Sequence, residues 1–196
     1  MPKDKIKRVF VPTILAMLVA MTSMTLTTGA YAQDACVDAE TTDRDGGLHF
    51  QGTPQVCADK SDDTATLTAT GDLAGAGQGA GTATLEADVS VTVGCLTNEP
   101  RGNPGGGQNE PSGLREAAGT TTATAPFEAT RQGHASFTVE TESISIEDLE
   151  VDGETFECPS AQQTEVIVGG FTFSNIVLTI EAQTGTITAT FPDVDP

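Results

Sequence analysis

The chain has 196 residues, a formal net charge of −19 and no Trp. The acidic excess disfavours binding to nucleic acid and to anionic membranes, because both carry negative charge. A chain of this length suits a single domain whose core can form without a metal ion.

Residues 1–32 are predicted to be a secretory signal peptide. A basic segment is followed by an apolar stretch and by Ala30-Tyr31-Ala32, a cleavage signal made of small residues. The basic residues are Lys3, Lys5, Lys7 and Arg8. One alternative is a retained membrane anchor, which is disfavoured because Pro12 and several Thr and Ser residues interrupt the apolar stretch. The other is a lipoprotein modified at Cys36, which is disfavoured because Asp34-Ala35 precedes that cysteine.

Cleavage after Ala32 leaves residues 33–196, which we predict to be one secreted or cell-surface domain. The removed segment carries four basic residues and one acidic residue, so the formal charge deepens from −19 to −22. The acidic residues are scattered, which favours a soluble, well-hydrated surface over a cation-binding one. No other stretch is long and apolar enough to cross a membrane.

All four cysteines, Cys36, Cys57, Cys95 and Cys158, follow the expected cleavage site. An even number in an exported domain predicts two disulfides, and four cysteines allow three pairings. We favour Cys36–Cys57, which closes a short N-terminal loop, and Cys95–Cys158, which ties the end of a long strand to a later segment. A metal site is the weaker alternative, because no C-x-x-C pair is present.

Alternation of apolar and polar residues predicts strands along the exported part. Thr64–Thr70 and Ala83–Cys95 alternate strictly, which is typical of strands with one buried and one solvated face. Between them, the Gly-rich segment 71–81 is expected to be a flexible turn. Residues 96–118 contain clustered Gly, Pro and Asn and are expected to form an irregular loop. Such a loop is either functional or disordered, and we favour disorder.

Further strands are expected after this loop. They are Thr120–Phe127, Ala135–Thr141, a stretch from Ile144, Phe156–Cys158 pairing back across Asp152-Gly153, Val166–Val168, Phe171–Ala182 and Thr186–Phe191. Gln183-Thr184-Gly185 predicts a tight turn between the last two, which form a hairpin. Eight or nine short strands without any helical period predict an all-β, Ig-like β-sandwich with Greek-key connections.

The sequence contains no motif that identifies a catalytic or cofactor site. His49 and His134 lack a neighbouring nucleophile and are interpreted as structural residues, and no G-x-S-x-G, H-E-x-x-H or phosphate-binding Gly-Lys-Ser/Thr motif is present. Asp43-Arg44-Asp45-Gly46-Gly47 resembles the first half of a calcium loop, but Pro54 stands where an EF-hand needs Glu. We interpret it as a turn and predict no metal, cofactor or catalytic residue.

Three segments resemble an uncharacterised group of small secreted β-rich proteins of bacteria and archaea. They are Gly47–Pro54, Cys95-Leu96-Thr97-Asn98 with the following Gly-Asn-Pro-Gly-Gly-Gly-Gln, and Cys158-Pro159. In that group a strand ending in C-x-N runs into a Gly-Asn-Pro-Pro-Gly-Gln loop, and a late Cys-Pro precedes the closing strands. The resemblance implies the sandwich fold and the Cys95–Cys158 disulfide, and it implies no activity.

These observations leave three hypotheses for function. The first is a non-enzymatic secreted or surface protein with a binding or structural role. The second is an extracellular assembly subunit that self-associates by strand exchange. The third is a carbohydrate-binding or hydrolytic protein, which is weakened because no Trp is present and the only Tyr, Tyr31, is removed with the signal.

Overall fold

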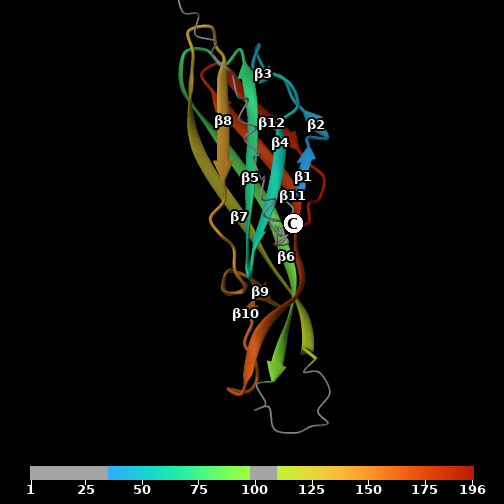
Figure 1. Cartoon of the computed structure of the whole chain (residues 1–196). Helices are drawn as coiled ribbons and strands as arrows, with labels where there is room; N and C mark the ends of the chain where they lie inside the picture. Colours follow the sequence, from blue (N-terminus) through green and yellow to red (C-terminus); the bar gives the residue numbers. More distant parts are fainter. Residues whose placement is uncertain (1–34, 98–109) are drawn as a thin grey trace, which may run out of the picture. The chain divides into compact units, whose positions relative to one another are not determined.

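Two antiparallel sheets form the described part of the chain, residues 35–97 and 110–196 of a computed structural model (Figure 1). They contain twelve strands and one short 3-10 helix, η1 (Ile146–Asp148). The sheets pack face to face, which confirms the predicted all-β sandwich. The expected signal peptide, residues 1–32, lies outside the described residues, as do residues 98–109 of the expected loop.

The first sheet, sheet A, is built around the central strand β5. Its strands are β1 (Ala35–Asp38), β4 (Gln55–Ser61), β5 (Thr64–Ala74), β3 (His49–Phe50) and β8 (Ala135–Glu140). On one side of β5 lie β4 and β3, on the other lies β8, and β1 pairs with the outer edge of β4.

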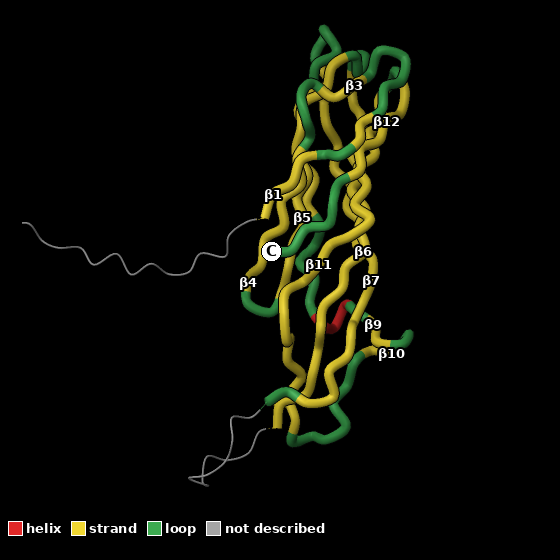
Figure 2. The backbone as a smooth tube through the Cα atoms, turned by 90° about the vertical axis from the view of Figure 1, so that its right-hand side faces the viewer, coloured by secondary structure: helices red, strands yellow, loops and turns green. Residues whose placement is uncertain are grey.

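The second sheet, sheet B, contains the three longest strands. In spatial order it consists of β10 (Glu154–Thr155), β9 (Glu150–Val151), β7 (Ser112–Ala129), β6 (Gly79–Thr97), β11 (Gln163–Ala182), β12 (Gly185–Thr190) and β2 (Thr41–Thr42). Figure 2 shows β7, β6 and β11 running side by side. The predicted hairpin between the last two long segments is confirmed, because β11 and β12 pair directly across Gln183 and Thr184.

The core lies between the sheets and follows the alternation seen in the sequence. On β6 the inward residues from Ala83 to Cys95 are all buried, while the residues between them, apart from the buried Gly94, are exposed or half-buried. The largest fully buried side chains include Leu67, Leu85, Phe171, Phe173 and Ile180. Burial of one such side chain contributes about 1.5–3 kcal/mol, so this layer is the main source of stability.

Several strands are longer than the sequence predicts. The expected turn over 71–81 shrinks to Gly75–Gln78, because β5 continues to Ala74 and β6 begins at Gly79. The expected irregular segment 96–118 is wrong at both ends, since β6 ends at Thr97 and β7 begins at Ser112. Residues 112–118 lack apolar alternation, but their register with β6 supplies the backbone pairing that local sequence does not signal.

The region after η1 also differs from expectation. Residues Phe156–Cys158 form no strand; instead β10 pairs with β9 across Asp152 and Gly153. The two segments expected at 166–168 and 171–182 are one strand, β11, with a register shift between Ile167 and Phe171. Gly169 and Gly170 lie in this shift, which explains why the alternation is interrupted there.

One end of sheet B has no sheet A opposite it. Figures 1 and 2 both show β6, β7 and β11 continuing past the hairpin formed by β4 and β5. Here the segment after β9 lies beside the ends of β6 and β7, and its Phe156 is buried. The Cys95–Cys158 disulfide joins the buried end of β6 to this segment, which is one of the two predicted pairings.

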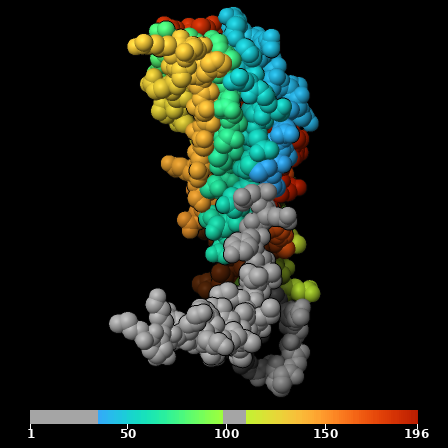
Figure 3. Space-filling model, turned by 45° about the horizontal axis from the view of Figure 1, so that its top comes forward, coloured from blue at the N-terminus to red at the C-terminus, as the bar shows by residue number. Residues whose placement is uncertain are grey.

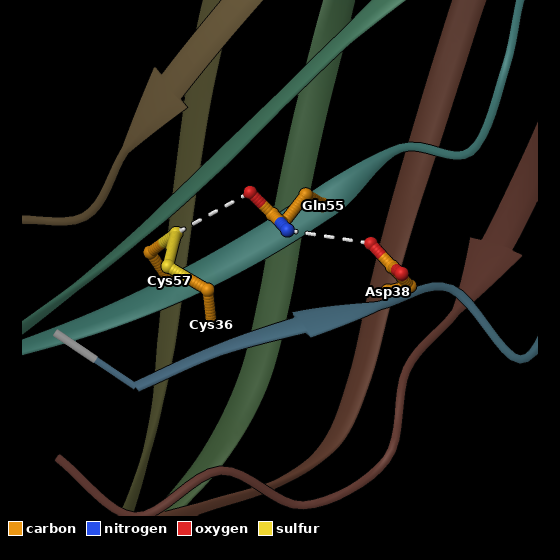
Figure 4. The surroundings of a disulfide bond; sticks show 4 residues. All are labelled: Cys36, Asp38, Gln55 and Cys57. Atoms are coloured by element: carbon orange, nitrogen blue, oxygen red, sulfur yellow. Dashed lines mark hydrogen bonds between the residues drawn. A yellow bond between two sulfur atoms is a disulfide. The ribbon is translucent and has the colours of Figure 1, made fainter.

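The other disulfide lies on the solvent side of sheet A. Cys36 and Cys57 are directly opposite each other on β1 and β4, with 4.0 Å between their Cα atoms. Figure 4 shows Gln55 beside this bridge, where its amide donates a hydrogen bond of 3.3 Å to Asp38 Oδ1. This second predicted pairing therefore fixes β1 to the edge of the sheet.

Gly75 in the turn between β5 and β6 is expected to tolerate no side chain. Its φ is +75°, and a Cβ there would overlap the carbonyl oxygen of Gly47. We expect Gly75→Ala to lower the free energy of unfolding by about 3 kcal/mol, from about 1–2 kcal/mol of backbone strain and about 1–3 kcal/mol of overlap. Urea unfolding measures this loss.

Gly153→Ala is the matched control for Gly75→Ala. Gly153 has a similar φ of +85°, but no atom lies within 4 Å of the point where its Cβ would stand. Only the backbone strain should remain, so we expect Gly153→Ala to lower the free energy of unfolding by about 1–2 kcal/mol. Equal losses in the two variants would show that the contact with Gly47 does not matter.

Candidate functional site

One edge of sheet B is unpaired over much of its length. Strand β7 pairs with β6 along one side, whereas on its other side the only strand pairing among the described residues is that of Ala118 with Glu150 of β9. Within the described ranges, no backbone partner is found for Thr120–Thr124 on this open side. An unpaired strand edge offers a row of hydrogen-bond donors and acceptors to another chain.

The direction of the peptide groups on β7 follows from two observations. Thr130 N donates to His134 O over 2.8 Å, so this even-numbered amide points away from β6 and toward β8. Pro126 lies opposite Thr82 in the ladder with β6. Because proline has no N–H, it fits in this ladder only if its nitrogen faces the open side, away from β6. Since peptide directions alternate along a strand, Thr120, Thr122 and Thr124 present their N–H and C=O groups at the open edge.

Strand β8 of sheet A presents a second open edge on the same side of the sandwich. Thr141 N donates to Leu67 O over 2.9 Å, so odd-numbered residues of this segment bond to β5. The peptide groups of Ser136 and Thr138 therefore point away from β5. In Figure 3 the yellow and orange segments, which include the end of β7, β8 and the residues after it, lie together along one margin of the visible face.

A groove of about 480 Å³ lies between β7 and the segment that follows β8. We call it the β7–β8 groove. Its lining residues are Thr120–Thr124 on one side and Glu140, Glu142, Ser143, Ile144, Asp148 and Leu149 on the other. The open part of the β7 edge is thus also one wall of the groove.

The core beneath the β7–β8 groove is only partly covered. On the inner face of β7, Ala117 and Phe127 are buried, with 0% and 5% of their surface exposed. Between them Thr121, Ala123 and Ala125 are half-buried, and all three side chains are small. Ile144 and Leu149 form an apolar floor, and Leu149 closes one end by packing against Gly119. The groove can therefore accept side chains as well as backbone.

The charges in the groove are all negative. Glu140, Glu142 and Asp148 line it, and no Lys, Arg or His is among its lining residues. Both the amide and the hydroxyl of Ser145 donate to Asp148 Oδ2 over 2.8 Å. These hydrogen bonds lower the pKa of Asp148 below its ordinary value of 3.8, so the carboxylate keeps its charge in weakly acidic solution.

The Ser145–Asp148 interaction leads to a pH-dependent prediction. We expect Ser145→Ala to lose about 0.5 kcal/mol of stability at neutral pH, at the low end for a helix cap because the site is exposed. Since the folded pKa of Asp148 lies below its unfolded value, this contribution is complete above about pH 4 and disappears as pH falls through the folded pKa. Urea midpoints of the variant and the wild type should therefore converge as the pH falls well below 3.8, and a difference that stays constant with pH would contradict the interpretation.

The two histidines singled out in the sequence lie elsewhere. His49 is on β3, with its Nδ1 2.7 Å from Gly47 O, and His134 lies in the turn between β7 and β8, where its backbone bonds Thr130. Neither lines the β7–β8 groove.

The acidic loop residues Asp43 and Asp45 bind strand β12. Thr188 Oγ1 donates to Asp43 Oδ2 over 2.6 Å, and Thr186 N donates to Asp45 Oδ2 over 3.3 Å. Both carboxylates thus connect this loop to sheet B, which supports its interpretation as a structural turn. Across residues 35–97 and 110–196, no group of three or more His, Cys, Asp and Glu side chains is placed to hold a metal ion.

The β7–β8 groove is not predicted by the sequence pattern. The pattern of Thr120–Phe127 predicts a strand, but its position at an open edge depends on which strands pair, and residues far apart in the chain determine this. One local signal is present: Pro126 within an otherwise regular strand indicates an edge position.

No family model matches the sequence, and a search of curated proteins finds no relative.

Proposed function

We propose that this protein is an exported, non-enzymatic binding module that holds an extended segment of a partner polypeptide along the open edge of β7. The observation that carries the proposal is the combination of free peptide groups at Thr120, Thr122 and Thr124 with a half-covered core beside them. A strand added to β7 would form hydrogen bonds with the free peptide groups and would cover the exposed part of the core.

The disulfides support the export part of this proposal. Two disulfides in a chain of this size are typical of proteins that fold in an oxidising compartment. The basic and apolar pattern of residues 1–32 agrees with that route. Among the helices that the structure describes, none has the length and hydropathy needed for a membrane span.

The boundaries of the open edge favour a short bound segment. Ala118 is paired with β9 at one end, and Pro126 offers no N–H at the other. Seven residues of β7, 119–125, lie between these limits, so the bound segment would have about the usual length of a strand.

Thr122→Pro tests the proposal through the backbone. Proline at this position removes an edge N–H, yet the ladder with β6 stays complete because the bonds to β6 come from the odd-numbered residues. A capped peptide of about eight residues that alternates Thr and Val is the probe. We expect the wild type to bind it, and Thr122→Pro to bind at least about tenfold more weakly, since a main-chain bond is lost and the ring obstructs pairing.

Thr122→Val is the matched control because it keeps the backbone N–H and removes only the hydroxyl. It should bind the peptide as the wild type does. Thermal unfolding confirms that each variant is folded, and Thr124→Pro provides a second edge variant should Thr122→Pro fail to fold. Undetectable binding by the wild type, or equal binding by a folded proline variant, would refute the proposed function.

A further inference from the structure

We propose that the segment held in the β7–β8 groove is cationic, with Lys or Arg at every second position. This inference rests on the proposed function and specifies its partner. It is carried by the charges and the apolar floor of the groove.

The partner's alternate side chains would point into the groove. In a strand added to β7, residues that share the inner face with Thr121 and Ala123 lie over the segment that follows β8. There they meet Glu140, Glu142 and Asp148, three carboxylates with no basic side chain among the other lining residues. Acidic side chains at these positions would be repelled, and neutral ones would leave the carboxylates without an opposite charge.

The shape of the groove favours long basic side chains over compact ones. Ile144 and Leu149 provide an apolar floor and are 6% and 2% exposed, whereas Glu140 and Glu142 at the rim are exposed. A Lys or Arg side chain can lay its methylene groups on such a floor while its charged end reaches the rim. The small inner side chains of β7 leave room for these methylene groups.

A second copy of this chain is a poor occupant of the groove. The chain has only nine basic residues against 28 acidic ones, so two copies repel each other. Two β7 edges placed together would offer only uncharged Thr and Ala side chains over Thr120–Thr124. Charge complementarity therefore points to a basic partner.

Binding of three capped peptides of equal length tests this inference: one alternating Lys and Val, one alternating Thr and Val, and one alternating Glu and Val. With labelled peptides and anisotropy at low salt, we expect the Lys peptide to bind about tenfold more tightly than the Thr peptide, since several exposed ion pairs with the groove each add a modest gain in affinity. The Glu peptide should bind most weakly. The advantage of the Lys peptide should shrink at high salt.

A charge-matched pair of variants locates the effect. Glu140→Gln/Glu142→Gln removes two charges from the groove, while Asp59→Asn/Glu181→Gln removes two exposed charges from β4 and β11. The first pair should remove most of the preference for the Lys peptide, with Asp148 as the one carboxylate left in the groove, and the second pair should leave most of it. If both pairs reduce it equally, general surface charge explains the binding and the inference is wrong.

The remaining outcomes separate this inference from the proposed function. Equal binding of the Lys and Thr peptides by the wild type, with loss in Thr122→Pro, would retain the groove and overturn its cationic preference. No binding of any peptide would overturn the proposed function itself. A concentration-dependent dimer of the free protein that Thr122→Pro disrupts would show that a second copy is the occupant, and this too would overturn the inference.

Discussion

The Cys95→Ala/Cys158→Ala variant is expected to lose about 4 kcal/mol of unfolding free energy, because the disulfide closes a loop spanning 63 residues. Within the described part of the chain, the segment that this bridge attaches contains β10, whose strand partner is β9 alone. Arg115 and Asp152 form an ion pair of 2.8 Å, but their side chains are 59% and 81% exposed, so the pair contributes little. Phe156 of this segment is buried, and Val151 of β9 packs against the core.

Removal of this disulfide should also expose the end of sheet B to proteases. Limited proteolysis of the variant should cut first between β9 and β11, and urea unfolding should give the loss of stability. The variant for comparison is Cys36→Ala/Cys57→Ala. Its two cysteines are separated by 21 residues, so we expect it to lose about 3 kcal/mol of unfolding free energy. A loss below about 1 kcal/mol for Cys95→Ala/Cys158→Ala would show that the segment is held by its other contacts.

Phe173→Ala is expected to lower the free energy of unfolding by about 3–5 kcal/mol, which is the usual range for truncating a buried Phe. Phe173 is fully buried on β11, where it lies opposite Val89 of β6. Its backbone also exchanges two hydrogen bonds of 2.9 Å with Val194, which brings the C-terminal residues against the sheet. The cavity left by alanine lies in the centre of the core, where neighbouring strands cannot close around it.

Leu114→Ala is the control for Phe173→Ala. Leu114 is 54% exposed near the start of β7, so we expect its truncation to change stability by no more than about 0.5 kcal/mol. Urea unfolding of both variants at one pH measures the difference. Similar losses would contradict the assignment of the core to the space between the sheets.

The sequence predicted the strands whose side chains alternate most regularly. Ala83–Cys95 lies within β6 because seven successive inward positions are apolar or Cys, and this pattern needs no knowledge of distant residues. The cysteine pairing was also predicted in full. In both cases the information is local or depends on few residues.

The parts that sequence did not predict depend on distant pairing. The start of β7 at Ser112 is stabilised by its register with β6, and its own residues give no strand pattern. The β7–β8 groove exists because β7 is open on one side beyond its short pairing with β9, and β8 is an edge strand of the other sheet. Neither Thr121 nor Ala123 shows from its identity that the core beside it is half-covered.

Residue-resolved hydrogen exchange of β7, with and without the peptide that alternates Lys and Val, tests the open edge most directly. In the free protein the amide of Thr122 should exchange rapidly, whereas the amides of Thr121 and Ala123 should be protected by their bonds to β6. Saturating peptide should slow exchange at Thr122 and leave its two neighbours unchanged. If Thr122 is as protected as Ala123 in the free protein, or remains unprotected in the complex, the β7 edge is not the binding site.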